Sequence, residues 1–267
     1  MLTVRALACG RGRVLLRGLS FDLRIGEVLG VLGANGAGKS TLLATLAGEI
    51  PPLEGEVRLH GKALCALNVI ALARWRAVLP QSPELAFGLR LETLLAMGAY
   101  PFPEISPARL CEMRSAALQC VGLTGMEGRN SRALSGGERQ RAQFARVWVQ
   151  AAGIREISHR PPVLFLDEPI AGLDPQHQLR LLHMARELSR QWSAAVLVVL
   201  HDVNLAARFC DRVALLADGG MVALDVPAAV LKPALLARAY GADAAIRIDA
   251  LDARRRWVEF ETPRAAP

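Results

Sequence analysis

The sequence has little of several residue types, and each shortage argues against a class of protein. Its five cysteines form no Cys-x-x-Cys pair and have no histidine at ligand spacing, so we interpret them as reduced thiols and expect neither a zinc site nor a disulfide framework. The longest clean apolar run, residues 194–200, is about a third of the length that a membrane span needs. Arg5, Arg11 and Arg13 interrupt the N-terminus, so no signal peptide is indicated. We therefore expect a soluble, cytosolic protein.

Lysine is also scarce, with three residues in 267, so the formal net charge of +7 comes almost wholly from arginine. Such a charge suits nucleic acid or the anionic face of a membrane. The arginines are spread over the whole length, however, and the charge alone selects neither partner. With 52% apolar residues, the chain can bury a substantial core in one large domain or in two unequal lobes.

One short segment matches the phosphate-binding pattern G-x-x-x-x-G-K-[ST] and has the expected surroundings. It follows the apolar run Val28–Leu32, a predicted strand, and precedes residues 42–46, a predicted helix that ends at Gly48. With so few lysines, a chance match would occur in roughly a few per thousand chains of this composition. We predict a phosphate-binding loop formed by Gly33, Ala34, Asn35, Gly36, Ala37, Gly38, Lys39, Ser40 and Thr41.

The residue types in this loop explain how it would hold a phosphate group. Glycines adopt backbone angles closed to other residues and let amide N–H groups approach an anion. The helix that starts near Lys39 adds the positive end of its dipole at the same place. Lys39 can reach the outer phosphates of a nucleotide, and the Ser40 hydroxyl can hold Mg²⁺.

Three further apolar segments end in polar residues, as parallel strands do when their ligand lies at the carboxyl edge of the sheet. Asp167 is placed to orient Mg²⁺, whereas Glu168 points the other way and can polarise a water that attacks the γ-phosphate. His201 could contact the γ-phosphate, and Gln81 can complete the Mg²⁺ shell. The alternative is that the two carboxylates only cap the next turn and that His201 is an ordinary turn residue. The predicted strands are residues 77–81, 163–166 and 195–200.

The segment Leu-Ser-Gly-Gly-Glu at residues 134–138 is a second design that can bind an anion. A serine and two glycines with free N–H groups precede a predicted helix over residues 139–152, so the positive end of that helix faces the same place. Taken alone, the pattern is also typical of an ordinary helix N-cap. The residues concerned are Ser135, Gly136, Gly137 and Glu138.

The order of the predicted elements indicates an α/β fold whose core is interrupted by helices. An antiparallel β start over residues 2–8 and 14–23 precedes the phosphate loop. Strand patterns vanish near residue 82 and return after residue 161, with helical spacing over 91–100 and 107–121. We predict four parts: residues 1–81, with the β subdomain and phosphate loop; a helical subdomain over 82–134, whose last helix continues to about residue 152; the rest of the core over 135–232; and a poorly periodic tail over 233–267, for which we have no firm account.

In this order, the phosphate loop, Gln81, residues 134–138, residues 163–168, residues 171–174 and His201 resemble the ATP-binding subunit of ABC transporters over residues 1–232. The resemblance implies a P-loop ABC ATPase core with an antiparallel β subdomain and an inserted helical subdomain. It implies ATP and Mg²⁺ as cofactors and assigns Lys39, Glu168 and His201 to hydrolysis. In that family the Ser135 loop of one subunit closes on the ATP held by the other, and Asp174 lies in the subunit contact. A homodimer with two composite sites is therefore expected.

Within that family, residues 47–49 and 201–207 look most like the importers of iron chelates, and the long segment 150–162 looks like the heme (hemin) importers. The resemblance implies ATP-driven heme import at the cytoplasmic face of the bacterial inner membrane. The implied partners are integral-membrane permease subunits, docked in the groove between Gln81 and the helical lobe, and indirectly a periplasmic binding protein.

Two other functions stay open. Import of a ferric siderophore or of cobalamin is the nearest alternative, because the cargo never touches this subunit. A non-transport ATPase of the same fold acting on nucleic acid is more distant, because such proteins usually carry two fused cassettes or long coiled coils, and both are absent here. We expect no nucleic-acid partner.

Three departures from the family pattern stand out. Ile170 occupies the place of a usual polar threonine, and Asp225 that of a common glycine near the end of the core. No aromatic residue lies between Thr3 and Ser20, where the family often stacks a ring on adenine. Arg11 or Arg13 could stack there instead, or the base is held loosely.

Overall fold

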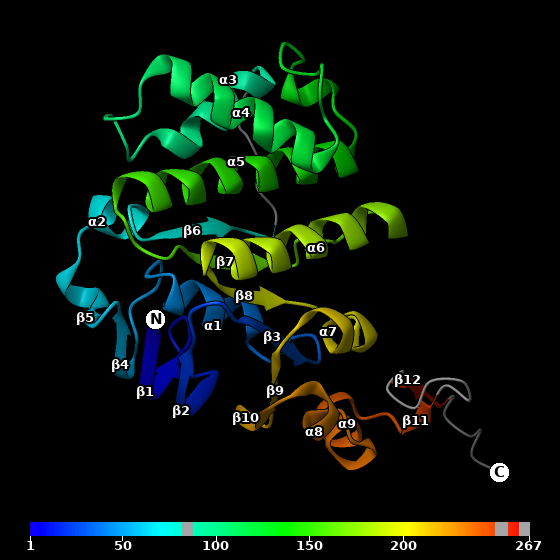
Figure 1. Ribbon diagram of the computed structural model, residues 1–267. Coiled ribbons are helices and arrows are strands. Elements are labelled where there is room, and N and C mark those ends of the chain that lie inside the picture. The colour runs from blue at the N-terminus through cyan, green and yellow to red at the C-terminus, as the bar shows by residue number, and fades with distance from the viewer. Residues whose placement is uncertain (82–87, 249–255, 262–267) are drawn as a thin grey trace.

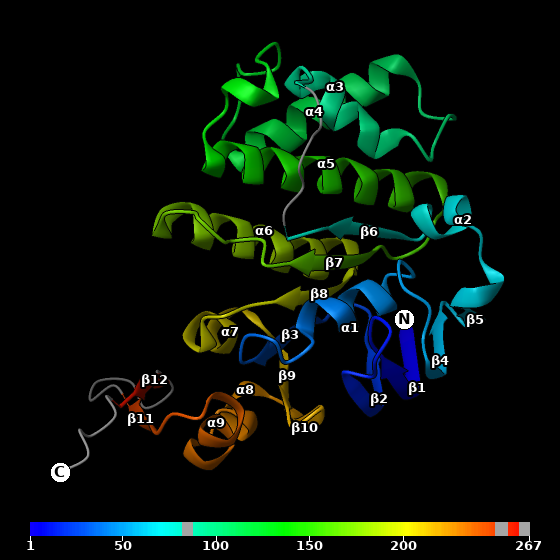
Figure 2. The same cartoon turned by 180° about the vertical axis from the view of Figure 1, so that it is seen from behind.

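The computed structural model describes residues 1–81, 88–248 and 256–261, and a six-stranded sheet lies at its centre (Figures 1 and 2). Five of the strands run parallel, and β10 pairs antiparallel with β9 at one edge. In order across the sheet, the strands are β10 (Gly220–Asp225), β9 (Arg212–Ala217), β3 (Val28–Gly33), β8 (Ala195–Val199), β7 (Val163–Asp167) and β6 (Arg76–Leu79).

The central sheet is buried on both faces because its strands contribute alternate side chains to two hydrophobic cores. In β8, for example, Val196 and Val198 pack into one core, whereas Leu197 and Val199 pack into the other. Successive side chains of a strand point to opposite faces, so a strand covered on both sides has no polar face. This arrangement explains why the middle strands read as unbroken apolar runs.

A second sheet covers one face, and helix α1 (Lys39–Leu46) packs against both sheets. All neighbouring strands in this second sheet are antiparallel. Leu42, Leu43 and Leu46 of α1 lie in the core that the two sheets share. The strands, in order, are β2 (Leu16–Leu23), β1 (Leu2–Cys9), β4 (Glu54–Leu59) and β5 (Lys62–Ala63), followed along the chain by the short helix α2 (Val69–Ala73).

A helical lobe covers the other face at the β6 edge. Its helices are α3 (Leu91–Ala96), α4 (Pro107–Val121) and α5 (Gly136–Ile157). Helix α5 packs against β6 on one side and against α3 and α4 on the other, and Figure 1 shows the three helices stacked above the sheet. Among the described residues no helix, including the 22-residue α5, is both long enough and apolar enough to cross a membrane.

The last part of the chain lies at the end of the molecule opposite the helical lobe (Figures 1 and 2). Helix α6 (Pro175–Trp192) precedes β8 and packs against β3 and β8, and α7 (Val203–Phe209) joins β8 to β9. After β10 come two short helices and an antiparallel hairpin: α8 (Pro227–Val230), α9 (Pro233–Tyr240), β11 (Ala244–Ile248) and β12 (Arg256–Phe260).

The predicted α/β fold is confirmed, with its central strands, its β start and its interposed helices, while the bounds of one helix need correction. The helix expected over 139–152 spans Gly136–Ile157, because Ser135 caps it three residues earlier, so much of segment 150–162 continues α5 and does not form a separate insertion. The tail, for which the sequence predicts no elements, forms α9 and the hairpin where it is described.

The packing of the helical lobe predicts a position where one methyl group destabilises the protein. A Cβ at Gly98 would collide with the backbone carbonyl of Arg146 on α5, and backbone cannot swing aside. We expect Gly98→Ala to lower the free energy of unfolding by about 2 kcal/mol. Gly128→Ala, whose Cβ meets nothing within contact distance, should stay within about 0.5 kcal/mol of wild type. Urea denaturation measures both, and equal stabilities would contradict the packing described.

Candidate functional site

The site lies at the carboxyl edge of the central sheet, where the loops that follow four parallel strands meet. Pairing places Val31 of β3 beside Val199 of β8, and Val199 beside Asp167 of β7, so these strands end at the same level. A cavity of about 630 Å³ opens there. It is lined by Leu15, Asn35, Gly36, Gly38, Lys39, Ser40, Thr41, Gln81, Glu168 and His201.

The phosphate loop depends on glycine at positions where another residue would be strained or blocked. Gly36 and Gly38 have left-handed backbone angles, with φ of 81° and 91°, and Gly38 is the N-cap of α1. At Gly33, φ is 149° and a Cβ would lie 2.6 Å from the Leu216 carbonyl oxygen. The loop therefore presents backbone N–H groups and the positive end of α1 to the cavity.

The Lys39 side chain folds back over the loop that precedes it. Its Nζ donates hydrogen bonds to the carbonyl oxygens of Gly33 (2.8 Å) and Ala34 (2.9 Å), and the residue is 6% exposed. Burial lowers the pKa of Lys39, while the nearby carboxylates of Glu168 and Asp167 act in the opposite direction. An ammonium group held in this way can exchange its carbonyl partners for phosphate oxygens.

Ser40 and Asp167 form the part of the site that suits a hard cation. The Ser40 hydroxyl donates to Asp167 Oδ1 at 3.1 Å. Burial raises the pKa of Asp167, and the hydrogen bond from Ser40 counters that rise. Hydroxyl and carboxylate oxygens are ligands that Mg²⁺ prefers. Among the residues described, no group of three or more acidic, histidine or cysteine residues is arranged so that it could hold a metal ion. The Gln81 side chain lines the same cavity.

Glu168 and His201 are brought together by the ends of two neighbouring strands. The His201 Nε2 lies 2.6 Å from Glu168 Oε1, with the carboxylate side chain 13% exposed and the imidazole 48% exposed. Glu168 has a φ of 48°, so the chain turns sharply after Asp167 and the two successive carboxylates are directed to different partners. A strained backbone at such a position is typical of functional sites.

Ser135–Glu138 and Asp174 lie elsewhere and do not line this cavity. The Ser135 hydroxyl accepts from the Glu138 N–H (3.2 Å), and the Glu138 carboxylate accepts from the Ser135 N–H (2.7 Å). This capping box starts α5, with Ser135 and Gly136 exposed to solvent. Asp174 caps α6 by accepting from the His177 N–H at 3.0 Å. Within one chain, therefore, the two predicted anion-binding loops do not line the same cavity.

Two contributors to the site carry no clear signal in the sequence. Leu15 lines the cavity, so the segment that lacks an aromatic residue contributes an aliphatic side chain, and neither Arg11 nor Arg13 is among the lining residues. Gln140, buried on α5, donates to the carbonyl oxygens of Pro169 (3.1 Å) and Glu168 (3.4 Å). Gln140 thus fixes the turn after β7 to the helix that the Ser135 loop begins.

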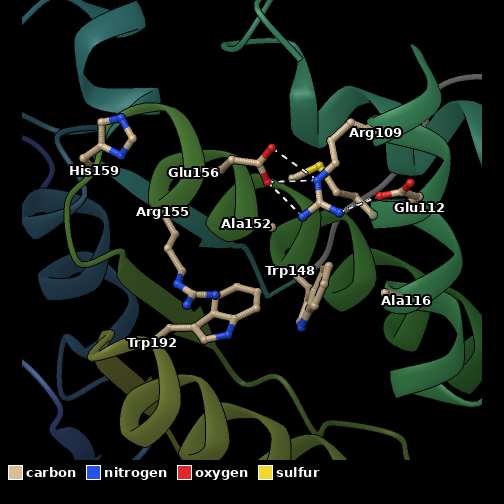
Figure 3. Close-up of a pocket in the computed structure, with 10 residues that line it drawn as sticks. Arg109, Glu112, Ala116, Trp148, Ala152, Arg155, Glu156, His159 and Trp192 are labelled. Carbon is tan, nitrogen blue, oxygen red and sulfur yellow. Dashed lines mark hydrogen bonds and ion pairs between the residues drawn. The ribbon is translucent and has the colours of Figure 1, made fainter. Parts of the chain in front are cut away.

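A second cavity, of about 350 Å³, lies between α4, α5 and the end of α6 (Figure 3). Arg109 pairs with Glu156 at 2.9 Å and with Glu112 at 2.7 Å, and the Arg155 guanidinium lies 5.4 Å from the centroid of the Trp192 ring. Trp148 and Trp192 pack together with ring centroids 5.0 Å apart. We interpret this cavity as a joint between the helical lobe and α6, because its aromatic and charged groups contact each other.

Comparisons with known proteins point to one family. The family model described as ABC transporter matches residues 16–171. The chain is 48% identical over 244 residues to the hemin import ATP-binding protein HmuV of Bordetella avium. This match covers 91% of this chain and 93% of the relative. The chain is 49% identical over 247 residues to HmuV of Bordetella bronchiseptica, with the same coverages, and 45% identical over 241 residues to HmuV of Burkholderia pseudomallei, covering 86% and 89%.

Solved structures share the fold. The ATP-binding subunit of an ABC transporter matches with a TM-score of 0.75 and 26% identity, over 85% of this chain and 90% of that chain. An ATP-binding cassette solved as a dimer with ADP and phosphate matches with a TM-score of 0.74 and 21% identity, over 85% and 99%. At that identity the second likeness concerns the fold alone.

The position of Lys39 predicts that its charge is indispensable. We expect Lys39→Ala to reduce ATP hydrolysis by at least about a hundredfold, because nothing else in the loop carries a positive charge to the outer phosphates. Lys62→Ala is the matched control: Lys62 is exposed on β5, above the Trp75 ring at 5.6 Å, and its loss should leave the rate unchanged. A phosphate-release assay measures both, and a Lys39→Ala rate within a few-fold of wild type would contradict the assignment.

Proposed function

The chain belongs to the ABC transporter family, and from that premise we propose that it is the ATP-hydrolysing subunit of a hemin importer. The observation that carries the proposal is the convergence of the phosphate loop, Ser40–Asp167 and Glu168–His201 at one edge of the sheet. The cargo is inferred from relatives named for hemin import, which cover nine tenths of the chain at nearly half identity.

ATP would bind with its phosphates in the loop of residues 33–41. Backbone N–H groups and the Lys39 ammonium would hold the β- and γ-phosphates. Ser40, Gln81 and Asp167 would hold Mg²⁺, which when bound neutralises charge on those phosphates. With Leu15 at the mouth of the cavity, the base would be held by apolar contact and not by a stacked ring.

Hydrolysis would use the pair formed at the ends of β7 and β8. The Glu168 carboxylate accepts a proton from a water as the water oxygen forms a bond to the γ-phosphorus, and the bond from that phosphorus to the bridging oxygen of ADP breaks. His201, whose Nε2 lies 2.6 Å from Glu168 Oε1, would keep the carboxylate oriented and would also donate a hydrogen bond to the γ-phosphate.

The catalytic centre would be completed by a second copy of the chain. The cavity of a single chain is not lined by any of the residues predicted to act in trans: Ser135, Gly136, Gly137, Glu138 and Asp174. Their exposed position at the start of α5 and at the turn before α6 suits contact with a partner subunit. We infer a homodimer in which each ATP is enclosed by the phosphate loop of one subunit and the Ser135 loop of the other.

Transport would require partners that span the membrane, and the subunit would bind them at the cytoplasmic face of that membrane. We propose that the helical subdomain, with predicted bounds 82–134, transmits closure of the dimer to permease subunits, and that a periplasmic binding protein acts only through them. Predicted parts 1–81 and 135–232 would form the rest of the ATPase core. The proposed permease groove lies between Gln81 and the helical lobe, and residues 82–87 lie outside the described part of the chain.

Replacing Glu168 separates binding from hydrolysis. Glu168→Gln keeps the shape of the side chain but removes the proton acceptor, so ATP should still bind while turnover falls at least about a hundredfold. The variant should accumulate as an ATP-bound dimer in size-exclusion chromatography. Glu54→Gln, at an exposed position at the start of β4, should behave as wild type. Monomers alone in the presence of ATP, or full activity of Glu168→Gln, would count against the proposal.

The cargo is tested in liposomes that contain the subunit with its permease. Because coupling passes through the docked helical lobe, we expect ATPase activity to rise when a hemin-loaded periplasmic binding protein is added. Hemin should accumulate inside only when Glu168 is intact. Stimulation by a ferric siderophore or by cobalamin, without stimulation by hemin, would show that the cargo is wrong while the transport ATPase stands.

A further inference from the structure

The C-terminal module, defined here as α9, β11 and β12, is built into the main core of the protein. Leu236 and Ala239 of α9, Ala244 of β11 and Val258 of β12 are all buried, and they belong to the same hydrophobic core as Val203 of α7. Strand β12 packs directly on α7, and Figures 1 and 2 both show the hairpin beside that helix. The module therefore supports the helix that follows the His201 loop.

One side chain joins the hairpin to that helix by two hydrogen bonds. Asn204, in the first turn of α7, donates from Nδ2 to the Val258 carbonyl oxygen at 3.1 Å. Its Oδ1 accepts from the Val258 N–H at 2.7 Å. The amide thus pairs with both polar backbone groups of one strand residue, a geometry that fixes orientation as well as distance.

The His201 loop is joined to α7 by the cap of that helix. Asp202 caps α7 by accepting from the N–H groups of Asn204 (2.7 Å) and Leu205 (2.9 Å), so the loop and the first turn of α7 form one unit. Since His201 directly precedes this unit, a shift of the first turn moves the imidazole relative to Glu168. Asn204 is the residue through which the hairpin holds that turn.

The same module also contacts the base of the phosphate loop. The Tyr240 hydroxyl is buried and lies beside the backbone of Gly33, the first residue of the loop. Burial raises the pKa of Tyr240 to about 12, so the phenol is neutral at physiological pH. Its ring packs edge-on against Phe260 of β12, with centroids 5.4 Å apart. The module thereby spans the two loops that face each other across the cavity.

We propose that Asn204 is a positioning residue for hydrolysis, which ties the His201 loop to the C-terminal hairpin and keeps the imidazole on Glu168. The proposal rests on the proposed function, since it assigns Asn204 a role through His201. Small displacements of catalytic groups reduce turnover more than they reduce substrate binding when the displaced group does not bind the ground state. Loss of the Asn204 clamp should therefore lower kcat and spare KM.

The test compares variants that remove two bonds, one bond or none. We expect Asn204→Leu, of similar size, to lower kcat about tenfold with the KM for ATP changed less than about twofold. Asn204→Asp keeps the acceptor for the Val258 N–H but loses the donor, so its kcat should lie between those of Asn204→Leu and wild type. Asn68→Ala is the control: Asn68 caps α2 through a 2.8 Å bond at the far side of the molecule, and its loss should leave both constants unchanged.

A double variant shows whether the effect passes through His201. In single-turnover hydrolysis of radiolabelled ATP, Asn204→Leu should slow the reaction in the wild-type background and have no further effect when His201→Ala is present. An unchanged kcat in Asn204→Leu would overturn the role proposed for Asn204 and leave that of His201 standing. The same loss of rate with and without His201 would do so too. Wild-type activity in His201→Ala would instead overturn the proposed role of His201 itself, and the inference with it.

Discussion

Burial of the central sheet on both faces is the constraint on which the rest of the structure depends. Strands covered by two hydrophobic cores have no room for polar side chains along their length, so polarity is confined to their ends. Parallel direction then brings the ends of β3, β7 and β8 to one edge. The phosphate loop, the two carboxylates and His201 meet there because the sheet leaves them no other position.

This constraint also decides how much could be predicted from the sequence. Apolar runs that stop at Asp167 and His201 predict strands and a shared edge, and the contact between Glu168 and His201 fits that prediction. The predicted start of α5 is three residues too late, because the capping box at Ser135 lets the glycines at 136 and 137 belong to the first turn of the helix. The C-terminal module was missed because α9 is too short to be stable alone and the hairpin depends on Asn204 and on core contacts from distant residues.

Three polar side chains of the site contact protein groups that a nucleotide, Mg²⁺ or water could replace. The Lys39 ammonium rests on backbone carbonyls, the Ser40 hydroxyl on Asp167, and the His201 imidazole on Glu168. Each pair satisfies a buried or half-buried polar group, and each of these groups can also bind phosphate, Mg²⁺ or water. In the Ser135 loop, by contrast, the polar groups of Ser135 and Glu138 bond to each other in the capping box. The loop is exposed, which suits contact with a partner subunit.

The central claim is that a single chain holds an incomplete catalytic centre and that two chains complete it. The most direct test is the specific ATPase activity of the isolated protein over a dilution series, with the mass of the particle measured at each concentration by analytical ultracentrifugation at saturating ATP. The account predicts that activity per subunit falls in step with the fraction of dimer. A constant activity per subunit at concentrations where the protein is monomeric would contradict it.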